Sequence, residues 1–281
     1  GNNDGIIRAT GTQTRDGHVW LTSNTGNTSI AGRVVARNAD GSGGTVEATA
    51  ANLTVKTGAH IDASAAKPGG NGGMVNVIAT GTTRMAGTIA ARGGDGGRGG
   101  VVETSGQSLA VAGDVDAGPG GHWLLDPHNL TVDSAAATTI DGSLNHGTSV
   151  TLKTTATGTS GPGVRATGPG DIIVASSLKW SGAAKWTLDA YRNVQINSGV
   201  TISHTGHGSL VLAADYGAHD SGTVLFKGNG KIDFSGSTGD VTIYYHPGSY
   251  ASPTSYKPKV ALHSGSKLTA NMTIDNATDL Q

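Results

Sequence analysis

Aromatic side chains that could recognise a ligand gather near the end of the sequence. Four of the six tyrosines fall between residues 244 and 256, in a segment rich in Gly, Pro and Ser that predicts a projecting loop. Exposed tyrosines between small polar residues are typical of surfaces that recognise sugars or proteins. The alternative is that the segment folds back and its rings cover apolar surface. The predicted ligand-binding surface consists of Tyr244, Tyr245, His246, Tyr250 and Tyr256.

Paired carboxylates are a second candidate chemistry. Asp114 and Asp116 flank Val115, and side chains two residues apart lie on the same side of a strand. If Val115 points into the core, both carboxylates point outward, and no basic residue is visibly paired with them. Two carboxylates on one face can hydrolyse glycosidic bonds. Such spacing is also common by chance, so a solvated face is the preferred interpretation.

Metal and nucleotide chemistry finds little support. His204 and His207 offer two ligands but no third is evident, so we expect two solvated turn histidines. The run from Gly93 to Arg98 resembles a calcium-binding nonapeptide, but Arg98 stands where that repeat requires aspartate, and a turn bulging from the fold is expected. No phosphate-binding glycine motif occurs. We predict no metal, no cofactor, no catalytic residue and no enzyme activity.

The composition restricts the class of protein that could carry these residues. The 281 residues include 46 Gly and 8 Pro, without collagen's strict repeat, and many apolar residues are β-branched. A net charge of −1 argues against nucleic-acid binding, because phosphate recognition needs a basic face. No apolar run approaches the roughly 20 residues of a membrane span, and no signal peptide is visible. Cysteine is absent, which is compatible with a secreted bacterial protein that has a long core.

An internal repeat predicts the architecture. Glycines that precede apolar segments recur at intervals of 27, 29, 27 and 21 residues. Apolar residues recur two and four positions after these glycines, and the position between them holds polar as well as apolar residues. This alternation is typical of a strand with one buried face. A unit of about 27 residues cannot bury that face alone, but stacked copies can. The glycines are Gly17, Gly44, Gly73, Gly100 and Gly121. The residues two positions after them, called the second column, are Val19, Val46, Val75, Val102 and Trp123. The residues four positions after them, called the fourth column, are Leu21, Ala48, Val77, Thr104 and Leu125.

We therefore predict an all-β chain: a right-handed parallel β-helix, or solenoid, with projecting loops. Residues 1–121 form regular coils, and residues 122–281 continue the helix with longer, less regular coils and loop insertions. We expect Trp123 to fill the interior of the solenoid, its bore, which smaller residues fill in the earlier coils. Pro127 is expected to end the strand that contains Trp123. No α-helix is expected anywhere. Later strands are expected at residues 149–152, 171–174, 186–188, 194–196, 210–212, 223–226 and 241–244.

Short motifs add a resemblance to a known family. Gly100-Val101-Val102-Glu103-Thr104-Ser105-Gly106 and Trp123-Leu124-Leu125-Asp126-Pro127 resemble the signature of filamentous-haemagglutinin-like adhesins, which are exported by two-partner secretion. The resemblance continues through residues 170–174 and 188–194 to the last residues, and covers roughly residues 43–281. The family's amino-terminal secretion domain, with its Asn-Pro-Asn motif, is not found here, which is expected of an internal segment.

The resemblance implies a secreted β-helical protein at the bacterial cell surface. Its partners would be a host-cell or bacterial surface glycan or protein, together with an outer-membrane transporter for the full-length protein. We expect a monomer. Some relatives carry sugars on Asn-x-Ser/Thr triplets, which makes Asn52 and Asn129 possible glycosylation sites among five such triplets. An adhesin segment, either stalk or binding part, is the preferred function; the alternatives are a haem- or haemoprotein-capturing exoprotein and a carbohydrate-active β-helix enzyme.

Overall fold

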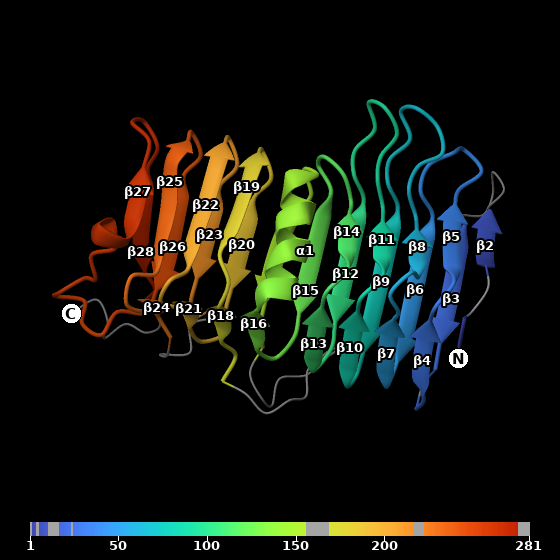
Figure 1. The fold of residues 1–281 in the computed structure, drawn as a ribbon, viewed down its shortest axis with the longest axis horizontal. Helices are drawn as coiled ribbons and strands as arrows, with labels where there is room; N and C mark the ends of the chain where they lie inside the picture. Colours follow the sequence, from blue (N-terminus) through green and yellow to red (C-terminus); the bar gives the residue numbers. More distant parts are fainter. Residues whose placement is uncertain are drawn as a thin grey trace.

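The computed structural model describes residues 2–3, 6–10, 17–23, 25–155, 169–215 and 222–274. Its strands stack in a parallel β-helix in which each regular turn contributes one strand to each of three faces (Figure 1). All strand pairs in the five sheets are parallel, apart from one isolated antiparallel bridge between Arg37 and Gly43. The predicted all-β solenoid is confirmed.

One face is a single sheet that runs the length of the molecule; we call it the long face. Its ten strands pair in the order of the chain, so the hydrogen-bond ladder is unbroken across residues 121 and 122. The strands are β3 His18–Thr22, β6 Thr45–Ala50, β9 Met74–Ala79, β12 Val101–Ser105, β15 His122–Asp126, β17 Ser149–Lys153, β20 Trp186–Asp189, β23 Leu210–Ala213, β26 Val241–Tyr245 and β28 Leu268–Met272.

The other two faces are each divided into an earlier and a later sheet. The second face contains β1 Asn2–Asn3, β4 Asn27–Ile30, β7 Asn52–Val55, β10 Thr82–Met85 and β13 Ser108–Val111, then β16 Leu130–Val132, β18 Ile172–Val174, β21 Val194–Ile196 and β24 Val224–Phe226. The third face contains β2 Ile6–Thr10, β5 Arg33–Arg37, β8 His60–Asp62, β11 Thr88–Ala90 and β14 Asp114–Asp116, then β19 Leu178–Gly182, β22 Thr201–Gly206, β25 Lys231–Ser237 and β27 Val260–Leu262.

The strand register matches the predicted repeat. The second column pairs residue by residue, from Val19 with Val46 to Val102 with Trp123, and its members are buried. The glycine column has a steric origin, because a Cβ placed on Gly73 would overlap the carbonyl oxygen of Gly44 in the preceding coil. Glycine lets the backbones of neighbouring coils approach at this corner.

Seven later strands were also predicted at the correct places, but the four later strands of the third face were not. Strands β17, β18, β20, β21, β23, β24 and β26 all overlap the expected ranges. Strands β19, β22 and β25 were missed, since the sequence pattern is dominated there by Ser, Thr, Gly and His rather than by apolar alternation. Strand β27 of the same face was missed as well, as were β16 on the second face and β28 on the long face.

The prediction that no helix occurs is wrong. Helix α1, Ser134–Asn145, replaces a strand on the third face, and in Figure 1 it lies between β14 and β19. Asp133 caps it, accepting a hydrogen bond from the backbone N–H of Ala136 at 2.9 Å. Its buried face mixes apolar with small polar residues, which hid the helical period: Ala136, Ala137, Thr139, Ile140, Ser143 and Leu144.

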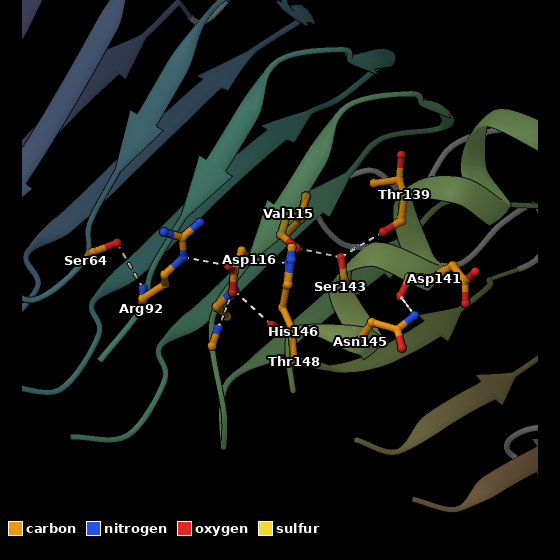
Figure 2. Close-up of polar contacts among 12 residues, drawn as sticks. Ser64, Arg92, Val115, Asp116, Thr139, Asp141, Ser143, Asn145, His146 and Thr148 are labelled. Carbon is orange, nitrogen blue, oxygen red and sulfur yellow. Dashed lines mark hydrogen bonds and ion pairs between the residues drawn. The ribbon is translucent and has the colours of Figure 1, made fainter. Parts of the chain in front are cut away.

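Side chains of α1 perform the pairing that a strand backbone would otherwise supply. A helix uses its own N–H groups internally, so it cannot continue the sheet ladder. Instead the hydroxyl of Thr139 donates to the carbonyl oxygen of Gly113 at 2.7 Å. The hydroxyl of Ser143 donates to the carbonyl oxygen of Val115 at 2.6 Å (Figure 2). These two side chains, four residues apart, lie on one face of the helix toward β14.

The opposite side of α1 serves the next strand in the same way. Asp141 accepts from the backbone N–H of Lys179 at 3.1 Å, and Asn145 accepts from that of Ser181 at 3.0 Å. These residues are again four apart. Helix α1 therefore joins the earlier and later sheets of the third face through two pairs of polar side chains.

The core changes in width near this junction. The bore of the earlier coils is filled mainly by Val, Ile and Ala. Trp123 is fully buried, its Nε1 donates to Thr104 Oγ1 at 3.0 Å, and β15 ends immediately before Pro127, as predicted. Beyond it the bore holds the buried rings of Trp180, Trp186, Phe234 and Tyr245.

Candidate functional site

The predicted tyrosine surface is partly an internal packing feature. Tyr245 and Tyr256 are buried, with their rings 5.1 Å apart in an edge-to-face contact. The hydroxyl of Tyr256 donates to the carbonyl of Val224 at 3.2 Å, and the hydroxyl of Tyr245 accepts from the backbone N–H of Thr254 at 3.1 Å. Exposed recognition by these two rings is therefore a wrong prediction, because residues 246–256 fold back over the end of the second face.

The other three residues of that surface are more accessible. Tyr244 is 41% exposed on the outer side of β26. His246 and Tyr250 pack edge to face with ring centres 6.0 Å apart, and the Tyr250 hydroxyl donates to the carbonyl of Thr273 at 2.6 Å. Ligand recognition by these three remains a prediction.

The two possible glycosylation sites differ in their surroundings. Asn52 is exposed on β7, where its amide donates to Asn27 at 3.0 Å and its carbonyl oxygen accepts from the N–H of Thr82 at 3.0 Å. Asn129 is partly buried, and its oxygen accepts from the N–H groups of Gly170 and Asp171. Asn52 is the more accessible of the two, and modification of either remains a prediction.

Two solvated turn histidines were expected, but only His207 is exposed in a turn, and the prediction is wrong for His204. His204 is buried on β22, in contact with the rings of Trp180 and Phe234. Its ring nitrogens lie 2.7 Å from Ser237 Oγ and 3.1 Å from the carbonyl of Gly182. Desolvation by burial lowers the pKa of His204. Among the described residues, no group of three or more His, Cys, Asp or Glu is placed to hold a metal ion.

The aspartate pair also departs from expectation. Asp114 is partly exposed, but Asp116 is buried and paired, whereas two outward, unpaired carboxylates were predicted. Asp116 Oδ2 accepts from Arg92 Nε at 2.5 Å and lies 3.5 Å from His146 Nδ1, which follows α1 (Figure 2). Its Oδ1 accepts from the N–H of Gly118 at 2.8 Å. Arg92 comes from the preceding coil, so the pairing appears only once the coils are stacked.

A hollow lies on the outer side of the third face, next to this ion pair. We call it the arginine groove; its volume is about 400 Å³, and strands β5, β8 and β11 form it. Small side chains line its centre and longer charged ones its borders. Its lining residues are Arg33, His60, Ile61, Asp62, Ser64, Ala65, Thr88, Ala90, Arg92 and Gly93.

Contacts between successive coils hold the charged residues of the groove. Asp62 Oδ2 accepts from Arg37 at 2.6 Å and lies 3.5 Å from Arg33. Its other oxygen accepts from the backbone N–H of Ser64 at 2.9 Å, and the hydroxyl of Ser64 accepts from the N–H of Arg92 at 3.0 Å. The chain of contacts thus links three coils.

Sequence reasoning missed this groove, although the repeat contains its signal. Arg33, His60 and Thr88 occupy one register column, separated by 27 and 28 residues. Aligning the second and third strands of each repeat, as well as the first, would have predicted that these side chains lie together.

The long face carries a separate group of charged residues. Burial, followed by the nearby Glu103 carboxylate, raises the pKa of Asp126 to about 6, while Lys153 acts in the opposite direction. Burial also raises the pKa of Asp189, which is the register partner of Lys153. A carboxyl group with such a pKa can serve as a proton donor near neutral pH.

Comparisons with protein-family models, with curated proteins and with solved structures find no match for this chain. Within the described residues, no helix is both long and apolar enough to cross a bilayer.

Proposed function

We propose that this chain is a segment of a secreted bacterial adhesin that attaches to surface glycans or proteins. The observation that carries the proposal is the arginine groove, in which coil-to-coil contacts hold exposed charged side chains on a rigid scaffold. Preorganised polar groups lower the entropy cost of binding. Such a groove suits recognition without requiring any reaction.

The shape of the molecule supports the same function. Nine steps along the ten-stranded long face, at ~4.8 Å each, give a rod of about 43 Å. A rod carries a binding surface away from its point of anchorage, which an attachment protein requires. Location at the bacterial cell surface and export through an outer-membrane transporter follow from the resemblance of residues 100–106 and 123–127 to filamentous-haemagglutinin-like adhesins.

A binding experiment with the purified chain tests this function. The chain, immobilised on beads, is incubated with cultured epithelial cells, bacterial cells and a glycan array. We expect attachment to at least one class of surface, and loss of it when Ala90 at the centre of the groove is replaced by Phe. Absence of attachment to all three would contradict the proposal.

A carbohydrate-active enzyme is the second candidate, and Asp126 is the observation that favours it. Its raised pKa keeps a fraction of the Asp126 carboxyl groups protonated near neutral pH, with the Glu103 carboxyl group nearby. The chain would then release new reducing ends from a polysaccharide panel, and Asp126→Asn would abolish that release. Unchanged release in Asp126→Asn would exclude this site.

Capture of haem or a haemoprotein is the third function considered. His246 and Tyr250 form the His/Tyr contact that this function would need. The test is a shift of the haem absorption band on mixing with the chain, and a spectrum identical to that of free haem would exclude it.

A further inference from the structure

We infer that the arginine groove binds the carboxylate groups of a linear acidic polysaccharide built from uronic acids. This inference rests on the proposed attachment function and names its ligand class.

The donors come from two arginines at the borders of the groove. The side chains of Arg33 and Arg92 are 52% and 53% exposed. Each guanidinium has five N–H donors, and the ion pairs described above use one nitrogen of each: a terminal nitrogen of Arg33 with Asp62, and Nε of Arg92 with Asp116. Several donors therefore have no carboxylate partner among the described residues. A guanidinium binds a planar carboxylate through two parallel hydrogen bonds.

The floor between the arginines admits a sugar ring. Thr88 and Ala90, on the outer side of β11, are the register partners of His60 and Asp62 on β8. Their short side chains leave the hollow of about 400 Å³. Pocket sizes of this order accommodate small ligands. Ser64 and His60 add polar groups that can bind ring hydroxyls.

The charge of this face selects a ligand with sparse negative charge. Arg33, Arg37 and Arg92 are balanced by Asp62, Asp114 and Asp116 on the same face. A densely sulfated or phosphorylated chain would meet three carboxylates as well as three arginines, and like charges close together repel. A polymer with one carboxylate per ring can reach the arginines with less repulsion.

The repeat of the fold suits a repeating ligand. Arg33 begins β5, and Arg92 lies two residues after β11, two coils further along and four positions past the register partner of Arg33. The two arginines are therefore separated by about 10 Å along the axis and by about 13 Å along the strand direction, diagonally across the groove. A linear polyuronate carries one carboxylate on every ring at regular intervals. Lying diagonally across the groove, it can present carboxylates to both arginines at once, and two linked contacts raise the overall affinity.

Direct binding to matched polysaccharides tests the inference. The probes are polygalacturonate oligomers and the same oligomers with their carboxylates methyl-esterified, titrated into the intact chain by calorimetry. We expect binding of the acid form only, weakening as salt rises. The loss of one charge-assisted hydrogen-bond pair in Arg33→Gln should weaken binding about tenfold or more. Arg33→Lys, which keeps the charge but lacks the fork, should retain part of the affinity.

Two further variants keep the test interpretable. Arg84→Gln removes an exposed arginine from β10 on the second face and should leave binding unchanged. Ala90→Phe fills the floor without altering charge and should abolish binding. Circular dichroism must show the same β signal in each variant. For the Arg33 variants this is expected, because the Arg33 side chain is half exposed and Asp62 keeps Arg37 as its partner.

Each outcome decides the matter. Equal binding of the esterified oligomer, or equal loss in Arg84→Gln, would overturn the inference. Binding of dextran sulfate but not of polygalacturonate would assign the groove to sulfate esters and overturn it too. If the chain attaches to cells but binds no polyuronate, the adhesive function stands and the inference fails; if it attaches to nothing, both fail.

Discussion

At the scale of single residues, small side chains decide how closely the coils approach. Gly44, Gly73 and Gly100 follow one another along the axis, and an added Cβ on Gly73 or Gly100 would overlap the carbonyl oxygen of the glycine before it. Backbone atoms cannot move aside as a flexible side chain can. These glycines therefore serve packing, whereas their conformational freedom is secondary, since none of the three has a positive φ.

The first prediction concerns this column. Gly73→Ala should lower the free energy of unfolding by about 2 kcal/mol or more, as overpacking in a rigid interior does. Urea denaturation of the purified chain measures the change. Gly248→Ala is the control, because a Cβ there meets no atom within 4 Å. Equal stability of Gly73→Ala and Gly248→Ala would show that the coils can separate at this corner without cost.

The second prediction concerns pH. Asp126 has a pKa of about 6 in the folded chain, above the ordinary aspartate value of 3.8, so the folded state disfavours its ionised form. The resulting loss of stability is absent below about pH 4 and complete above about pH 6. A shift of this size corresponds to about 3 kcal/mol for a fully buried group, and partial exposure of Asp126 reduces this to about 1 kcal/mol.

Asp126→Asn should therefore raise the melting temperature at pH 7.5 and leave it unchanged at pH 4. Asp171 provides the opposite case: burial raises its pKa, but hydrogen bonds from Arg192 and Asn193 outweigh burial and lower it overall. Asp171→Asn should lower stability at pH 7.5, with the difference disappearing as the pH falls below the usual range of an aspartate. Thermal scans across pH measure both, and shifts of the same sign in the two variants would refute the assignment.

At the scale of elements, α1 shows how a helix can replace a strand in a parallel stack. The carbonyl groups of β14 and the N–H groups of β19 need partners that a helix backbone does not provide. Thr139 and Ser143 satisfy one side, and Asp141 and Asn145 the other. Both pairs have the i, i+4 spacing that places side chains on one side of a helix.

The third prediction follows from these hydrogen bonds. The double variant Thr139→Val, Ser143→Ala should lose about 2 to 4 kcal/mol of stability, because it leaves two carbonyl groups at the helix–strand contact without their partners. Denaturant unfolding measures the loss. Thr138→Val alters an exposed threonine of the same helix and should change little. A double variant as stable as Thr138→Val would mean that the hydroxyls do not hold α1 in the stack.

At the scale of the whole molecule, the long face unites two regions that differ in their cores. The predicted boundary between residues 121 and 122 coincides with the step from small side chains to Trp123 in the bore. The other two faces break near this step, but β12, β15 and β17 pair without interruption. Each coil contacts mainly its neighbours, and this sheet connects them across the step. A change that destabilises one coil should therefore also destabilise the coils on both sides of it.

The fourth prediction tests that continuity. Trp123→Ala should cost about 3 to 5 kcal/mol through loss of buried surface and the cavity left behind. Hydrogen exchange should quicken on both sides of the site, in β12 and in β17. Trp20→Ala is the control, since Trp20 lies on the long face with 62% of its surface exposed. Faster exchange confined to one side would show that the two regions are stabilised independently.

The amino-acid sequence by itself determined the solenoid, the strands of the long face apart from β28, and the inward columns. It could do so because each coil repeats the same alternation of buried and exposed positions, and Val46, Val75 and Val102 report the same local environment. The change from small buried side chains to Trp123 was predictable for the same reason, because Trp123 differs in size from the other residues of the second column.

Only the tertiary structure decided what the outward and polar residues do. Asp116 meets Arg92, and Tyr256 covers Val224, across separations of 24 and 32 residues. Such pairings depend on the register of whole coils, whose lengths vary, and local pattern does not contain that register. The helical period of α1 was hidden for a related reason: Thr139 and Ser143 are buried polar residues whose partners belong to another coil. Stacking converts distant positions into neighbours, and so the groove exists only in the assembled fold.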